Sequence, residues 1–188
     1  GSAATASLLR SNPNILKNSV RFVAEQDSLN ASILGPDVTP DSAEFDLFIK
    51  EIHREMTTKA GQKCTAVRRI ITPESQTEAV IEALSARLAK TQIGDPRLET
   101  TRMGALVSNS QKHDVLEKAA IIGQEAERVF GDPENFSVDG ANAEKGAFVP
   151  PMLFHCENPD AAQRVHDTEA FGTVYTVMGY RDLDHAVA

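Results

Sequence analysis

KAGQKCTAVRR, residues 59–69, joins the two clearest local patterns of this 188-residue chain. Before it, apolar side chains recur at helical spacing between Phe45 and Met56 and predict a helix, which Gly61 can end. After it, residues 67–71, with the sequence VRRII, are rich in β-branched side chains and predict a strand. A helix that leads directly into a strand is typical of α/β domains.

Helices and strands alternate along the rest of the chain. Helical patterns cover residues 2–10, 74–90 and 110–130, and a last helix begins at Asp182. Strand patterns cover residues 20–23, 31–34, 148–154 and 173–178, and residues 132–146 form a polar loop. The prolines within residues 148–154 favour a strand at the edge or entry of a sheet. This alternation predicts an α/β fold with a largely parallel sheet flanked by helices.

Composition excludes several classes of protein. The chain is 41% hydrophobic with 5% aromatic residues and no tryptophan, so we expect one aliphatic core. The net charge of −8 and the lack of a basic cluster argue against a nucleic-acid partner. The apolar runs are too short to cross a membrane, and the first residues do not resemble a signal peptide. The two cysteines, Cys64 and Cys156, form no disulfide framework, and we expect a reducing, cytoplasmic location.

Cys64 lies in the predicted turn between the helix and the strand, where a thiol can face a cleft. Lys59, Lys63 and two arginines surround it with positive charge, which favours a reactive thiolate. Gly61 lets the backbone turn closely, so that the Cys64 amide can donate to a developing oxyanion. The alternative is an inert cysteine that packs beside the sheet.

The run Gly61-Gln62-Lys63-Cys64, with Ala66 and Arg69, resembles the active-site signature G-Q-x-C-x-A-x-x-R of the aldehyde dehydrogenase superfamily. Further resemblances follow in the family's order: Gly1-Ser2 before a helix, Gly94-Asp95-Pro96 with Met103-Gly104-Ala105-Leu106, and Glu169-Ala170-Phe171-Gly172. The stretch from Glu55 to Ala66 is similar to a branch that contains semialdehyde dehydrogenases of phenylacetate and benzoyl-CoA degradation. The resemblance implies oxidation of a small-molecule aldehyde, which is CoA-linked in this branch, with NADP or NAD as cofactor.

The family's mechanism implies specific roles. Cys64 would form a thioester with the substrate, and a carboxylate would activate the water that hydrolyses it. The family's E-L-G-G-K motif for that base is altered here to residues 23–30, VAEQDSLN. Glu25 is the preferred base, because it follows a hydrophobic strand and could project into the cleft near Cys64. Asp27 is the rival, since strand alternation would place both on one face, and either could instead be a solvated carboxylate.

The resemblance also implies a cofactor site. Glu169 would hold the ribose hydroxyls beside the nicotinamide, and Phe171 would pack against that ring or else serve the core. Gly1 and Ser2 would face the cofactor at a helix N-terminus, where amide groups favour anions. The five histidines show no metal-ligand spacing, so we expect no metal site.

The resemblance implies a division of the chain into residues 1–20, the tail of a cofactor-binding domain, and residues 21–188, a catalytic domain incomplete at its C-terminus. The full-length protein would then be a homo-oligomer, and the isolated chain would be inactive. Two other functions stay open: a dehydrogenase-like binding protein with a vestigial Cys64, and an acylating enzyme that passes the acyl group to CoA.

Overall fold

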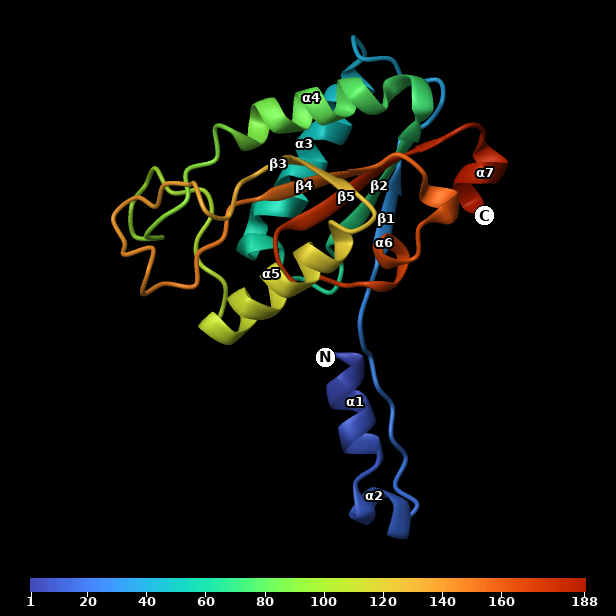
Figure 1. Cartoon of the computed structure of the whole chain (residues 1–188), viewed down its shortest axis with the longest axis vertical. Coiled ribbons are helices and arrows are strands. Elements are labelled where there is room, and N and C mark those ends of the chain that lie inside the picture. Colours follow the sequence, from blue (N-terminus) through green and yellow to red (C-terminus); the bar gives the residue numbers. More distant parts are fainter.

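The computed structural model, which describes residues 1–188, is built on a five-stranded sheet with helices on both faces (Figure 1). The strands are β1 (Asn30–Ile33), β2 (Val67–Pro73), β3 (Glu127–Phe130), β4 (Met152–Cys156) and β5 (Val174–Tyr180), in the spatial order β1-β2-β5-β4-β3. All neighbouring strands are parallel except β3, which is antiparallel to β4. The predicted α/β fold with a largely parallel sheet is confirmed.

The α-helices account for most of the remaining regular structure. They are α1 (Ala3–Arg10), α2 (Pro13–Lys17), α3 (Ala43–Thr57), α4 (Thr77–Leu88), α5 (Asn109–Ile122), α6 (Arg164–Asp167) and α7 (Leu183–Val187), with short 3₁₀ turns at Thr58–Gly61, Glu74–Gln76 and Pro159–Ala161. Ser42 caps α3 by accepting from the Phe45 amide, which fixes where this long helix begins. None of the helices has both the length and the hydrophobicity that a membrane span requires.

The sheet separates two hydrophobic clusters. Alternating side chains explain the division, because Tyr175 and Val177 belong to one cluster, and Val174 and Met178 to the other. Helices α3 and α4 cover the first face, and α5 covers the second. The core is mostly aliphatic, as the composition predicted, but it forms two clusters and includes four aromatic side chains: Phe45, Phe148, Phe154 and Tyr175.

Two predicted strands differ from the structure. Residues 20–23 form no strand: Val20 and Val23 are exposed in an extended segment, since no neighbouring strand pairs with them. Residues 148–154 form a strand only from Met152, and this strand lies inside the sheet between β5 and β3. Its prolines precede the hydrogen-bonded part, so they do not force it to the edge.

The predicted helix over residues 110–130 is too long. It ends at Ile122, where Gly123 caps it, and residues 127–130 form the edge strand β3 instead. Val129 and Phe130 are half-buried against the first cluster, so tertiary packing overrides the helical pattern of the preceding residues.

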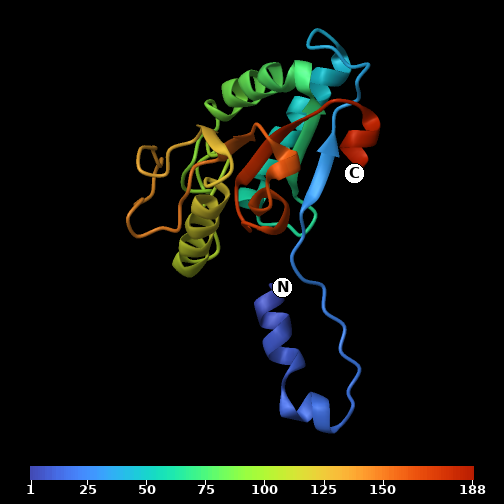
Figure 2. The ribbon, with the colours of Figure 1, turned by 45° about the vertical axis from the view of Figure 1, so that its right-hand side comes forward.

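Residues 1–29 form an arm that projects from one end of the sheet (Figure 2). Helices α1 and α2 lead away, and an extended segment returns beside them. The returning segment is tied back to the start of α1: the Gly1 nitrogen donates to the Glu25 carbonyl at 2.9 Å, and the Ala3 amide donates to Asp27 at 3.0 Å. The division of the chain at residues 20 and 21 stays a prediction.

The packing of α4 predicts the effect of one substitution. Leu84 is fully buried on α4, so Leu84→Ala should lower the free energy of unfolding by about 2–5 kcal/mol through lost apolar contact and a residual cavity. Urea denaturation measures this difference. Leu47→Ala on α3, where Leu47 is 57% exposed, is the matched control and should change stability by about 0.5 kcal/mol or less. Equal losses for both variants would contradict the assigned packing.

Candidate active site

The turn before Cys64 has an unusual backbone. Lys59, Ala60 and Gly61 follow one another with φ of 53°, 52° and 72°, all in the left-handed region. Each non-glycine residue there costs roughly 1–2 kcal/mol, so surrounding contacts must hold the turn. A Cβ on Gly61 would lie 2.3 Å from the Gly172 carbonyl oxygen, so only glycine fits. The turn is therefore pressed directly against the segment that follows Phe171.

The backbone at Cys64 is held from the arm side as well. The Ser28 hydroxyl and the Asn30 side-chain amide donate to the Cys64 carbonyl at 2.6 and 2.8 Å. Arg69, the arginine of the signature, donates twice to the Leu29 carbonyl, at 3.1 and 2.6 Å. These bonds hold the Cys64 backbone in place and leave its side chain exposed to solvent.

The cations near Cys64 are engaged with other groups. Lys63 pairs with Glu55 at 2.6 Å, and the Arg68 guanidinium donates to the carbonyls of Gly61 and Gly172. Of the basic residues that the sequence placed around the thiol, Arg68 holds the backbone of the turn, whereas Lys63 pairs with a carboxylate of α3. Their effect on thiol reactivity stays a prediction.

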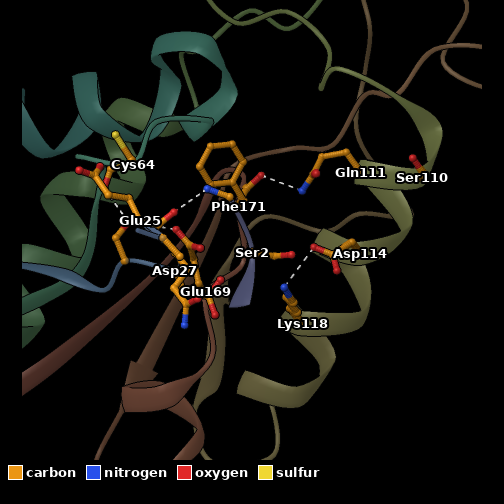
Figure 3. Close-up of a pocket in the computed structure, with 14 residues that line it drawn as sticks. Ser2, Glu25, Asp27, Cys64, Ser110, Gln111, Asp114, Lys118, Glu169 and Phe171 are labelled. Atoms are coloured by element: carbon orange, nitrogen blue, oxygen red, sulfur yellow. Dashed lines mark hydrogen bonds and ion pairs between the residues drawn. The ribbon is translucent and has the colours of Figure 1, made fainter. Parts of the chain in front are cut away.

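One cavity of about 990 Å³ brings all the predicted site residues together (Figure 3). Its wall includes Gly1, Ser2, Glu25, Cys64, Glu169 and Phe171, together with the rival base Asp27. Cys64 and Glu25 lie at the same end of the cavity in Figure 3, with Glu169 beside them. Segments that are far apart in sequence therefore converge on the thiol.

The two candidate bases occupy different environments. Asp27 has φ of 40° and its carboxylate accepts from the Ala3 amide at 3.0 Å, so it caps the start of α1. The Glu25 carboxylate is exposed and forms no hydrogen bond or ion pair within the chain. Since residues 20–29 are not a strand, the alternation that placed both on one face does not apply. The geometry favours Glu25, whose carboxylate is free to accept a proton.

The wall around Glu169 suits the nicotinamide-ribose end of a dinucleotide. Glu169 accepts from the Ser28 hydroxyl at 3.1 Å through one oxygen, which leaves the other for ribose hydroxyls. Phe171 is half-buried and offers an aromatic ring to a planar group, while its carbonyl accepts from Gln111 at 3.1 Å. This donor set fits hydroxyl groups and a flat ring.

The start of α1 is less open to an anion than the sequence suggested. Ser2 accepts from the Thr5 amide at 3.2 Å, and Asp27 accepts from the Ala3 amide. A phosphate at this position would meet the Asp27 carboxylate, which opposes the favourable helix terminus. Gly1 and Ser2 line the cavity, but their role toward a cofactor stays a prediction.

The opposite wall was missed from the sequence. It consists of Ser110, Gln111, Asp114 and Lys118, all on α5, and Lys118 pairs with Asp114 at 3.3 Å. Their spacing of three and four residues does place them on one helix face. Such a face is usually solvated, so the spacing alone did not indicate a site.

Cys156 provides an internal contrast to Cys64. It is buried in β4, and burial raises the pKa of its thiol above the ordinary value. No three His, Cys, Asp or Glu side chains gather in a way that could hold a metal ion. Cys64 is therefore the exposed thiol, and it lines the cavity.

Comparison with known proteins identifies the family and the fold. The chain is 48% identical over 188 residues to the 3,4-dehydroadipyl-CoA semialdehyde dehydrogenase of Aromatoleum evansii, covering all of this chain and 36% of that relative. Among solved structures it resembles aldehyde dehydrogenase C of Pseudomonas syringae, complexed with NAD⁺ and octanal, at 26% identity and a TM-score of 0.81, covering 100% of this chain and 36% of that one. Betaine aldehyde dehydrogenase of Staphylococcus aureus shares the fold at 24% identity and a TM-score of 0.84, covering 100% of this chain and 35% of that one.

The chain thus spans about a third of the length of the relatives it matches. Residues 1–188 match the aldehyde dehydrogenase family, which confirms the resemblance drawn from the GQKC signature. On the strength of this match and of the shared fold, the chain belongs to the aldehyde dehydrogenase family.

Proposed function

We propose that this chain supplies the nucleophile-bearing part of an NAD(P)-dependent aldehyde dehydrogenase, with Cys64 as the nucleophile. The observation that carries the proposal is the exposed Cys64 thiol, held on a strained turn at the end of a cavity lined by Glu25, Glu169 and Phe171. Since the chain covers about a third of its relatives, the activity is assigned to the full-length protein.

The residues of the chain support a covalent route. The Cys64 thiolate forms a bond to the aldehyde carbon, and the carbonyl oxygen takes the negative charge. The Cys64 amide donates no hydrogen bond within the chain, so it is free to donate to that oxyanion. A bound nicotinamide dinucleotide would supply the hydride acceptor. Loss of the hydride from the Cys64 adduct would leave a thioester on Cys64.

Glu25 completes the turnover. Its free carboxylate accepts a proton from a water molecule, which then attacks the thioester carbon. The carbon–sulfur bond breaks, the carboxylic acid product forms, and the thiolate of Cys64 is restored. Asp27 does not serve this step, because its carboxylate caps α1.

The cofactor would be NADP or NAD. Glu169 would accept from the ribose hydroxyls and Phe171 would pack against the nicotinamide, while Gly1 and Ser2 would lie beside the same molecule. The NAD⁺ complex of the Pseudomonas syringae relative supports a nicotinamide dinucleotide without distinguishing between the two forms.

The substrate would be an acyl-CoA semialdehyde from aromatic ring degradation, as the name of the Aromatoleum evansii relative suggests. The cavity walls carry Glu25, Asp27, Asp114 and Glu169 against one cation, Lys118. The uncharged aldehyde end of the substrate would enter beside Cys64, and the CoA moiety would lie away from these carboxylates. We also propose a cytoplasmic homo-oligomer for the full-length protein.

Thiol reactivity tests the nucleophile. In the native full-length protein, iodoacetamide should alkylate Cys64 and spare Cys156, because one thiol is exposed and the other buried. Peptide mass spectrometry of the labelled protein measures this selectivity. Cys64→Ser should abolish reduction of NAD(P) by an acyl-CoA semialdehyde, whereas Cys156→Ala should retain it. An unreactive Cys64 and no reduced cofactor would instead support a non-catalytic binding protein.

Substitution of the base separates hydrolysis from acyl transfer. Glu25→Gln should leave hydride transfer intact and slow thioester hydrolysis by about 10²–10⁴-fold, since the amide cannot accept the proton. Rapid-quench mass spectrometry should then show an acyl adduct on Cys64 after a burst of reduced cofactor. Asp27→Asn is the matched control and should leave hydrolysis much less affected. Undiminished turnover of Glu25→Gln with free CoA would point to an acylating enzyme.

A further inference from the structure

Arg68 has no assigned role in the family signature, which uses Arg69. The two neighbouring arginines face different groups: Arg69 bonds the Leu29 carbonyl beside the arm, whereas Arg68 is 4% exposed and points to the opposite side of β2. Its guanidinium donates to the Gly172 carbonyl at 2.5 Å and to the Gly61 carbonyl at 2.7 Å. One side chain thus joins the turn before the nucleophile to the segment after Phe171.

We propose that Arg68 is a positioning residue, which locks the Cys64 turn onto the Phe171–Gly172 segment and so fixes the thiol relative to the cofactor-facing wall. This inference rests on the proposed function, because it assigns meaning to that wall. It extends the function to a residue that does not line the cavity itself.

The Arg68 side chain bonds backbone carbonyls and forms no ion pair. Its Nε atom is buried without a hydrogen-bond partner. The guanidinium instead lies 5.8 Å from the ring centroid of Phe171 and 5.5 Å from that of Tyr175. Burial lowers the pKa of Arg68, and the nearby Tyr175, Glu169 and Glu55 oppose this change.

The chemistry of the guanidinium suits a link between two carbonyls. Its donors lie in a rigid planar fork, so the carbonyls of Gly61 and Gly172 are held at a set separation. A lysine ammonium is a single point of charge on a flexible stem and cannot fix both in the same way. The left-handed residues 59–61 direct the Gly61 carbonyl to this fork, which relates the strain of the turn to the position of Arg68.

The two linked segments carry the groups that must meet during hydride transfer. Gly61 precedes Cys64 by three residues, and Gly172 directly follows Phe171 and closes the segment that begins at Glu169. The segments already touch, since a Cβ on Gly61 would lie 2.3 Å from the Gly172 oxygen. A displacement of about 1 Å between reacting groups can slow a reaction by about 10²-fold. Loss of the link at this contact should therefore slow hydride transfer.

Three variants of the full-length protein test the role of Arg68. Arg68→Met removes the charge and the hydrogen bonds to the carbonyls of Gly61, Lys63 and Gly172. Arg68→Lys keeps the charge, and Arg54→Met removes an exposed arginine that pairs only with Glu51 on α3. Hydrogen exchange should become faster at the amides of residues 61–66 and 170–173 in Arg68→Met, with β2 and β5 unchanged. Arg54→Met should match the parent protein.

Kinetics supply the second measurement. Arg68→Met should lower kcat by about tenfold or more, with a smaller change in the KM for the aldehyde, because the link orients groups without touching substrate. Arg68→Lys should recover part of kcat. Alkylation of Cys156 reports on folding throughout, and this thiol should remain protected in each variant.

The outcomes are separable. Unchanged exchange at residues 61–66 and 170–173 in Arg68→Met would overturn the link, whether or not the parent protein oxidises aldehydes. A kcat of Arg68→Met within about twofold of the parent would overturn its role in positioning. If Arg68→Met exposes Cys156 and does not fold, the comparison of Arg68→Lys with the parent decides: faster exchange in both segments supports the link, and unchanged exchange overturns it.

Discussion

The contact between the backbone of Gly61 and that of Gly172 is the constraint on which the site depends. It leaves no room for a side chain at residue 61, and it is reached only because three consecutive residues adopt the left-handed conformation. The cost of that conformation is offset by α3 before the turn and β2 after it, both of which pack into the first hydrophobic cluster. The packed core therefore holds the Cys64 turn in a conformation that the turn alone would not favour.

The arm adds a second constraint from a distant part of the sequence. The side chains of Ser28 and Asn30 donate to the Cys64 carbonyl, and the Ser28 hydroxyl also lies within hydrogen-bond distance of Glu169. One short segment therefore contacts both the Cys64 turn and the segment that begins at Glu169. The same segment carries two carboxylates, Asp27 and Glu25, in different environments. Asp27 stabilises the start of α1, and this leaves Glu25 without a partner in the cavity. A carboxylate that is not needed for structure can serve chemistry.

Local periodicity and the signature motif were enough to predict the elements around Cys64 and the class of fold. The helix that leads to Cys64, the strand β2 and the parallel sheet are confirmed, because apolar spacing reports directly on which face is buried. The strand predicted at residues 20–23 is absent, and the strand predicted at 148–154 begins only at Met152 and lies inside the sheet. Both errors arise because the place of a strand depends on partner strands that a local stretch of sequence does not contain. Helix α5 shows the same limit for the site: its polar face resembles a solvated surface until the fold places it across from Cys64.

The two arginines at the end of the signature stretch, Arg68 and Arg69, hold different segments from opposite faces of one strand. Period-two alternation along β2 sends Arg68 and Arg69 to opposite faces, so adjacent residues reach different loops. Arg69 holds the returning arm through the Leu29 carbonyl, and Arg68 holds the turn through Gly61 and the far loop through Gly172. Because both bond backbone carbonyls, neither contact depends on the side chains of the loops it holds. The backbone on either side of the thiol is thus held from both faces of β2.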